Sequence, residues 1–110
     1  MKQYVIDELR PKDYEKIKAY LDERYALGGL QNIYWIPLEP GILTDLQCEH
    51  QACQPFYFTF EMHKDRLACE LLIRTRQRVR CACMVYATET QRNWLIRFID
   101  AIFDELGIQT

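Results

Sequence analysis

Apolar and polar residues alternate in three segments in the second half of the chain. They span residues 56–63, 67–74 and 79–86, with an apolar residue at every second position. This period of two is typical of antiparallel strands that bury one face. The connections near Lys64 and Arg76 are short enough for hairpins. The pattern therefore predicts a meander of three strands.

Two further segments favour strands by residue type. Ile33–Ile36 combines aromatic and β-branched residues, and residues 3–8 contain Tyr4-Val5-Ile6. Such side chains pack well on a pleated surface. Both segments are predicted to extend the sheet.

A helix is predicted over residues 12–27. Pro11 suits the first helical position, and Gly28 can adopt the left-handed conformation that ends a helix. A shorter helix is predicted from Asp45 to about Ala52, because Thr44 and Gln47 form a capping box. The apolar face of the first helix comprises Tyr14, Ile17, Leu21 and Tyr25.

The clearest predicted helix is the last one. Thr88 and Gln91 form its capping box, it runs to about Leu106, and Gly107 ends it. It is apolar around most of its circumference, so we expect burial on more than one side. The predicted architecture is α+β: a single domain over residues 1–110, with a mainly antiparallel sheet and the two long helices packed on one face.

Composition narrows the function classes. The chain has 110 residues, is 49% hydrophobic and 27% charged, and carries a formal net charge of −2. This excludes wholesale disorder and makes nucleic acid an improbable partner. The longest apolar run, residues 81–87, is too short to cross a membrane. With an acidic start and an odd count of five cysteines, we expect a cytoplasmic protein with reduced thiols and no membrane association.

A metal site is one hypothesis. Cys48, His50 and Cys53 lie within six residues, and these side chains are ligands that zinc prefers. His63 completes the candidate set, while Cys69 and the pair Cys81/Cys83 are other possible sources of ligands. A continuous helix over 45–52 would point Cys48 and Cys53 apart, so a closed site requires a distorted helix. The alternative is a loop helix with one cysteine turned inward, and the same residues are candidates for thiol chemistry.

A second hypothesis is anion binding by the cluster Arg74, Arg76, Arg78 and Arg80. Arginine forks suit phosphates and carboxylates, which indicates a phospholigand or nucleic-acid site. The alternative is that arginines at a hairpin tip keep a sheet edge soluble.

A third hypothesis is an interface. The outer sheet face is more apolar than a fully hydrated face should be, and contiguous apolar surface usually marks a protein interface. We therefore expect a homodimer, with another protein as a further candidate partner, unless a segment such as residues 38–54 covers that face. The expected interface residues are Leu72, Met84, Trp94, Phe98, Ile102 and Phe103.

The chain resembles small bacterial proteins of about this length in three segments, which are Ile33–Trp35, Cys53–Phe58 and Tyr86–Thr88. This resemblance implies no activity. The order of helix, sheet and helix is also similar to that of acidic secretion chaperones, which act as dimers on an extended partner.

No motif in the sequence specifies a reaction. The leading interpretation is a non-enzymatic interaction module that self-associates and needs no cofactor. The alternatives are the metal or thiol site and the phospholigand or nucleic-acid binder.

Overall fold

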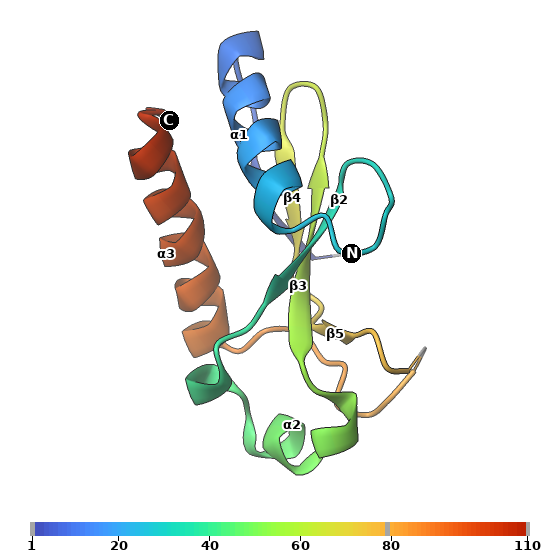
Figure 1. The fold of residues 1–110 in the computed structure, drawn as a ribbon. Helices are drawn as coiled ribbons and strands as arrows, with labels where there is room; N and C mark the ends of the chain where they lie inside the picture. The colour runs from blue at the N-terminus through green and yellow to red at the C-terminus, as the bar shows by residue number, and fades with distance from the viewer. Residues whose placement is uncertain (1, 79, 110) are drawn as a thin grey trace.

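The computed structural model, which describes residues 2–78 and 80–109, has one antiparallel sheet with its long helices packed on one face (Figure 1). This confirms the predicted α+β architecture. The strands are β1 (Gln3–Ile6), β2 (Ile33–Pro37), β3 (Phe56–Met62), β4 (Leu67–Glu70) and β5 (Arg74–Thr75). The helices are α1 (Pro11–Arg24), α2 (Asp45–Glu49) and α3 (Glu89–Leu106), with short 3₁₀ turns η1 (Pro40–Ile42) and η2 (Gln51–Cys53).

The sheet is organised around β3. The spatial order is β1-β4-β3-β2, all antiparallel, and β5 pairs with the first residues of β3. The β3–β4 hairpin closes where Met62 faces Leu67. The strands predicted within residues 3–8, 33–36 and 56–63 are present as β1, β2 and β3, with β1 and β3 shorter than predicted.

The core lies between β3 and the long helices. Phe56, Phe58, Phe60 and Met62 alternate along β3, and each is at most 3% exposed. Phe58 stacks on Trp94 of α3 at 6.1 Å between ring centroids. Burying side chains of this size stabilises the fold by about 1.5–3 kcal/mol each.

The strand predicted over residues 67–74 is interrupted. Phe60 faces Cys69 and Phe56 faces Thr75, so β3 advances four positions while its partner advances six. Leu71 and Leu72 are the two extra residues, and they loop out of the β3 ladder. β4 and β5 are the two halves of this strand.

The third predicted strand, residues 79–86, is wrong. The described residues 80–85 form no strand, and only an isolated bridge joins Leu72 to Tyr86. Val79 lies outside the described residues. The looped-out residues form main-chain bonds with the end of this segment instead. Leu72 bridges to Tyr86, and the amide of the next residue, Ala87, donates to the Leu71 carbonyl at 2.8 Å. Main-chain groups displaced from one ladder thus find partners in a loop.

Both predicted first-half helices are shorter than expected. α1 ends at Arg24 rather than 27, and the Tyr25 carbonyl then accepts from the Trp35 amide at 3.3 Å. The following loop passes close to the Trp35 indole, which leaves no room for a Cβ at Gly28. The helix predicted over 45–52 stops at Glu49, and η2 follows after His50.

Both predicted capping boxes are present, and they interlock. Thr44 and Gln47 cap α2, and Thr88 and Gln91 cap α3. The Gln91 side-chain amide donates to Gln47 Oε1 at 2.9 Å, and both residues are fully buried. The starts of α2 and α3 are therefore fixed to each other. α3 ends at Gly107 in the left-handed conformation, as predicted.

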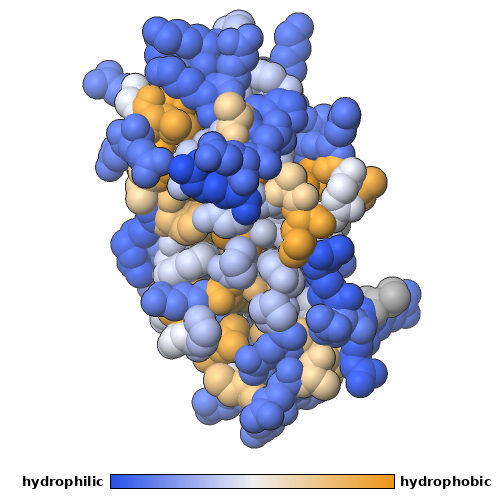
Figure 2. Space-filling model, in the orientation of Figure 1, coloured by the Kyte–Doolittle hydropathy of each residue, from blue (hydrophilic) through white to orange (hydrophobic). Residues whose placement is uncertain are grey.

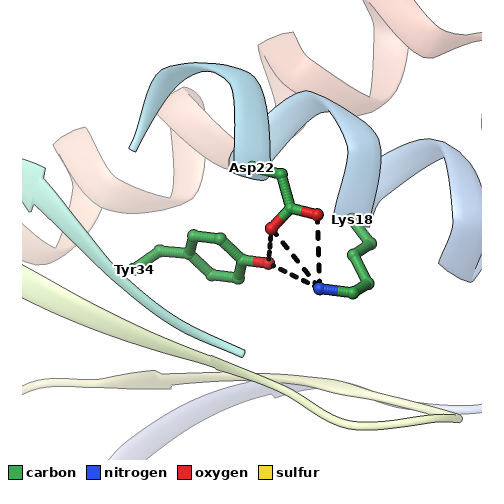
Figure 3. A network of polar contacts seen from close by, with 3 residues as sticks. All are labelled: Lys18, Asp22 and Tyr34. Carbon is green, nitrogen blue, oxygen red and sulfur yellow. Dashed lines mark hydrogen bonds and ion pairs between the residues drawn. The ribbon is translucent and has the colours of Figure 1, made fainter. Parts of the chain in front are cut away.

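A small polar cluster joins α1 to β2 (Figure 3). The Tyr34 hydroxyl donates to Asp22 at 2.5 Å, and Lys18 Nζ lies 3.2 Å from the same hydroxyl. The cluster pins the helix to the strand at the rim of the core.

Candidate metal centre

Four metal-ligand side chains converge near α2 and β5, at the lower end of the molecule in Figure 1. They are His50, Cys53, Cys81 and Cys83, and their donor atoms all lie within 4.8 Å of one another. We use "the lower end" for the two segments that carry them, which are residues 45–54 and the described part of 74–87 (74–78 and 80–87).

The donor types and one sulfur–sulfur distance suit a tetrahedral metal, whereas His50 Nδ1 lies closer to the Cys81 sulfur than tetrahedral bonds would place it. Zinc–sulfur bonds of about 2.3 Å at tetrahedral angles place two sulfurs about 3.8 Å apart. The sulfurs of Cys53 and Cys81 are 3.8 Å apart, and His50 Nδ1 lies 3.1 Å from the Cys81 sulfur. Three cysteines and one histidine form an established structural zinc donor set. The residues present therefore fit a zinc ion.

The first pair of donors is created by a break in the helix. α2 is only five residues long, and its C-cap His50 has φ −88° and ψ 62°. The chain then tightens into η2, in which the Cys53 amide donates to the His50 carbonyl at 3.0 Å. Side chains three positions apart on a 3₁₀ turn lie on the same side. This is the distorted helix that a closed site requires.

The second pair lies in a tight turn. The Met84 amide donates to the Cys81 carbonyl at 3.0 Å, which closes the turn Cys81-Ala82-Cys83-Met84. The pairs are tied together nearby, because the Thr75 hydroxyl of β5 donates to the Cys53 carbonyl. This bond joins β5, the strand that precedes the loop, to η2.

Cys81 is more ready than Cys83 to bind a cation as a thiolate. The pKa of Cys81 is lowered to about 6. The chief cause is a hydrogen bond from the main-chain N–H of Cys83, and hydrogen bonds with the neighbouring side chains lower it further. Burial, and hydrogen bonding to Cys81, raise the pKa of Cys83 to about 12. A bound metal would displace the remaining thiol protons, since metals bind the thiolate.

An open cavity of about 540 Å³ lies over the cluster. His50, Cys53 and Cys81 line it, together with Arg78 and Arg80. Cys81 is partly exposed, whereas Cys53 and Cys83 are 2% and 0% exposed. The cluster is therefore open to solvent on the Cys81 side.

The structure separates the metal ligands predicted from the sequence. His50 and Cys53 belong to the cluster, whereas Cys48 is exposed and lies outside it. His63 Nε2 instead pairs with Glu61 at 2.9 Å. Cys69 is a core residue of β4, where burial raises the pKa of its thiol.

The sequence interpretation named Cys81 and Cys83 only as other sources of ligands and left them out of its candidate set, because it assigned both to the buried face of a strand. The available signal was the spacing. Cys81-Ala82-Cys83 is the closest cysteine pair in the chain, and it complements His50-Gln51-Ala52-Cys53. Two short ligand pairs separated by a longer segment are common in structural zinc sites, although Cys81-Ala82-Cys83 is tighter than the usual spacing of two to four residues.

The four predicted anion-binding arginines point to different neighbours. Arg74 pairs with Glu70 at 2.6 Å, and the Arg76 guanidinium lies over the Trp35 ring, 5.4 Å from its centroid. Arg78 and Arg80 line the cavity above the metal ligands.

The predicted interface residues of α3 face the chain's own core. Ile102 and Phe103 are 5% and 4% exposed, and Trp94 and Phe98 pack partly buried against the sheet. Leu72 and Met84 are half-buried near the lower end. Figure 2 shows apolar groups interspersed with hydrophilic ones on the visible face.

Comparison with protein families, with curated proteins and with solved structures found no match for this chain. Within residues 2–78 and 80–109, no helix combines the length and apolar character needed to span a membrane.

Proposed function

We propose that this chain is a small zinc-binding module, and that the zinc ion has a structural role. His50, Cys53, Cys81 and Cys83 would supply all four ligands. The observation that carries the proposal is the convergence of four donor atoms within 4.8 Å, from two segments far apart in sequence.

The donor set favours a structural over a catalytic role. A catalytic zinc site keeps one position free for water or substrate, whereas four protein ligands fill the tetrahedron. The proposal therefore agrees with the sequence interpretation of the chain as a non-enzymatic protein. The ion would join η2 to the loop before α3. The apparent free energy of binding of structural zinc to zinc-finger peptides is about 10–16 kcal/mol, which is large enough to fix such a link.

The local chain supports a need for such a link. Between β5 and α3 the described residues form only turns and one isolated bridge. A segment with so little regular pairing gains few main-chain hydrogen bonds of its own. Zinc would supply the missing constraint by fixing Cys81 and Cys83 against η2.

The test is the metal content of the full chain, purified without an affinity tag and reconstituted with zinc under reducing conditions. We expect one zinc per chain in native mass spectrometry and elemental analysis. Cys83→Ser and His50→Ala should each lose the metal. Cys48→Ser and His63→Ala are the matched controls, and both should retain it.

Circular dichroism of each variant separates loss of a ligand from loss of the fold. A chain that takes up no zinc, or one whose controls lose zinc as readily as the ligand variants, would overturn the proposal. One iron per chain in place of zinc would keep the site and reassign the metal.

A further inference from the structure

The proposed zinc site has one ligand that a small molecule can reach from outside. The open cavity of about 540 Å³ is lined by Cys53 and Cys81, but Cys83 is not part of its wall. Of the three cysteine ligands, only Cys81 is more than 2% exposed. A reagent that enters the cavity would therefore meet the Cys81 sulfur first.

A second sulfur lies ready to pair with it. Cys53 Sγ is 3.8 Å from Cys81 Sγ, and a disulfide needs about 2.05 Å. The two residues are 28 positions apart and come from separate segments of the lower end. A disulfide between them would join the same two segments as the metal.

We propose that Cys81 is an oxidation site for hydroperoxides, and that Cys53 resolves it into a disulfide with release of the zinc ion. This inference rests on the proposed zinc site. It adds a redox-dependent exchange, in which a covalent link replaces a metal link between η2 and the loop.

The chemistry balances with a hydroperoxide as the only oxidant. The Cys81 thiolate attacks one peroxide oxygen, the O–O bond breaks, and the sulfur becomes a sulfenic acid. The leaving oxygen takes a proton and departs as water or an alcohol. The Cys53 thiolate then attacks the Cys81 sulfur, the S–O bond breaks, and hydroxide leaves and is protonated to water.

The two thiolates together lose two electrons, which reduce the peroxide. Zinc is not oxidised or reduced. It loses two of its four ligands, and we expect it to leave as the aqueous ion, because His50 and Cys83 alone do not complete a tetrahedral site.

The test uses the zinc-loaded full chain and hydrogen peroxide, with a chromogenic chelator that reports released zinc. We expect one zinc and two thiols lost per chain. Peptide mapping without reductant should find Cys53 joined to Cys81. Dithiothreitol followed by zinc should restore the starting state, and Cys48→Ser should respond like the wild type.

Two variants make the same ligand change at different thiols. Cys83→His keeps both reacting sulfurs, so it should still form the disulfide between Cys53 and Cys81. Cys53→His removes the resolving sulfur, so it should release zinc about tenfold more slowly. If either variant fails to take up zinc, the inference is judged from the peptide map of the oxidised wild-type chain alone.

Two outcomes would overturn the inference and leave the zinc site standing. One is that zinc is retained while only Cys48 is oxidised, and the other is a disulfide between Cys81 and Cys83. A chain that never binds zinc would overturn both.

Discussion

Tyr34 carries a polar group through an otherwise apolar part of the core. Its side chain is 1% exposed, and its hydroxyl reaches Asp22 and Lys18 on α1. The hydrogen bond from Tyr34 is the main cause that holds the pKa of Asp22 below its usual range. Burial raises the pKa of Tyr34, so the phenol stays neutral and can donate. The cluster is thus a charge-assisted hydrogen bond that fixes α1 on the sheet.

This cluster predicts an acid-sensitive contribution to stability. A carboxyl group with a lowered folded-state pKa stabilises the fold above its unfolded pKa of about 4, and the contribution is lost as the pH falls through the folded value. At pH 7 we expect Asp22→Asn to be less stable than the wild type in urea unfolding. The difference should narrow as the pH falls below about 4. A difference that stays constant down to pH 2 would contradict this assignment.

Tyr34→Phe removes the donor without changing the ring that packs in the core. We expect a loss of about 0.5–1.5 kcal/mol in the free energy of unfolding at pH 7. The double variant with Asp22→Asn should lose less than the sum of the two single changes, because both remove the same bond.

At the scale of elements, the two capping glutamines join α2 to α3. Gln91 donates to the Ile42 carbonyl at 3.0 Å and to Gln47 Oε1 at 2.9 Å, while its own oxygen accepts from the Thr88 amide. One buried side chain thus satisfies groups in three segments. Because α2 leads directly into His50, this contact also positions the first half of the proposed metal site.

Gln91→Glu distinguishes the capping bond of α3 from the bonds that join α3 to α2, which we call the interlock. The carboxylate can still accept from the Thr88 amide, but it faces two buried acceptors where the amide used to donate. We expect a loss of about 2 kcal/mol or more in urea unfolding, from the unpartnered buried groups. Gln109→Glu, at an exposed position beyond α3, is the control and should change stability little. Equal stability of the two variants would show that the interlock contributes nothing.

The same scale shows which elements can be inferred from sequence. The two capping boxes are local, since donor and acceptor lie three positions apart, and both were correctly predicted. The break at His50 and the looped-out Leu71 and Leu72 depend on partners distant in sequence, so no local pattern marks them. The alternation over 79–86 was misleading because cysteine counts as apolar. Cys83 is indeed buried, but beside other metal-ligand side chains rather than in a strand.

At the scale of the whole molecule, the chain has two parts held by different forces. The sheet and its long helices rest on a large apolar core, which the sequence pattern predicts because burial follows periodicity. The lower end has few core side chains, and it is held by hydrogen bonds such as those from Gln91 to Gln47 and from Thr75 to the Cys53 carbonyl, beside the cluster of His50, Cys53, Cys81 and Cys83. The strand pairing of β3 with β4 and β5 brings the second pair back beside the first. That long-range geometry could not be derived from spacing alone.

This division predicts that removal of zinc loosens one part of the molecule and spares the other. Under the zinc proposal, chelation should speed hydrogen exchange at the amides of His50, Cys53 and Met84, which form hydrogen bonds within the lower end. Amides of the β3–β4 ladder should keep their protection, because their bonds lie over the apolar core. Exchange measured by mass spectrometry on zinc-loaded and chelated chains gives both readings. Uniform loss of protection would mean instead that the ion supports the whole fold, and that the sheet and helices are not stable without it.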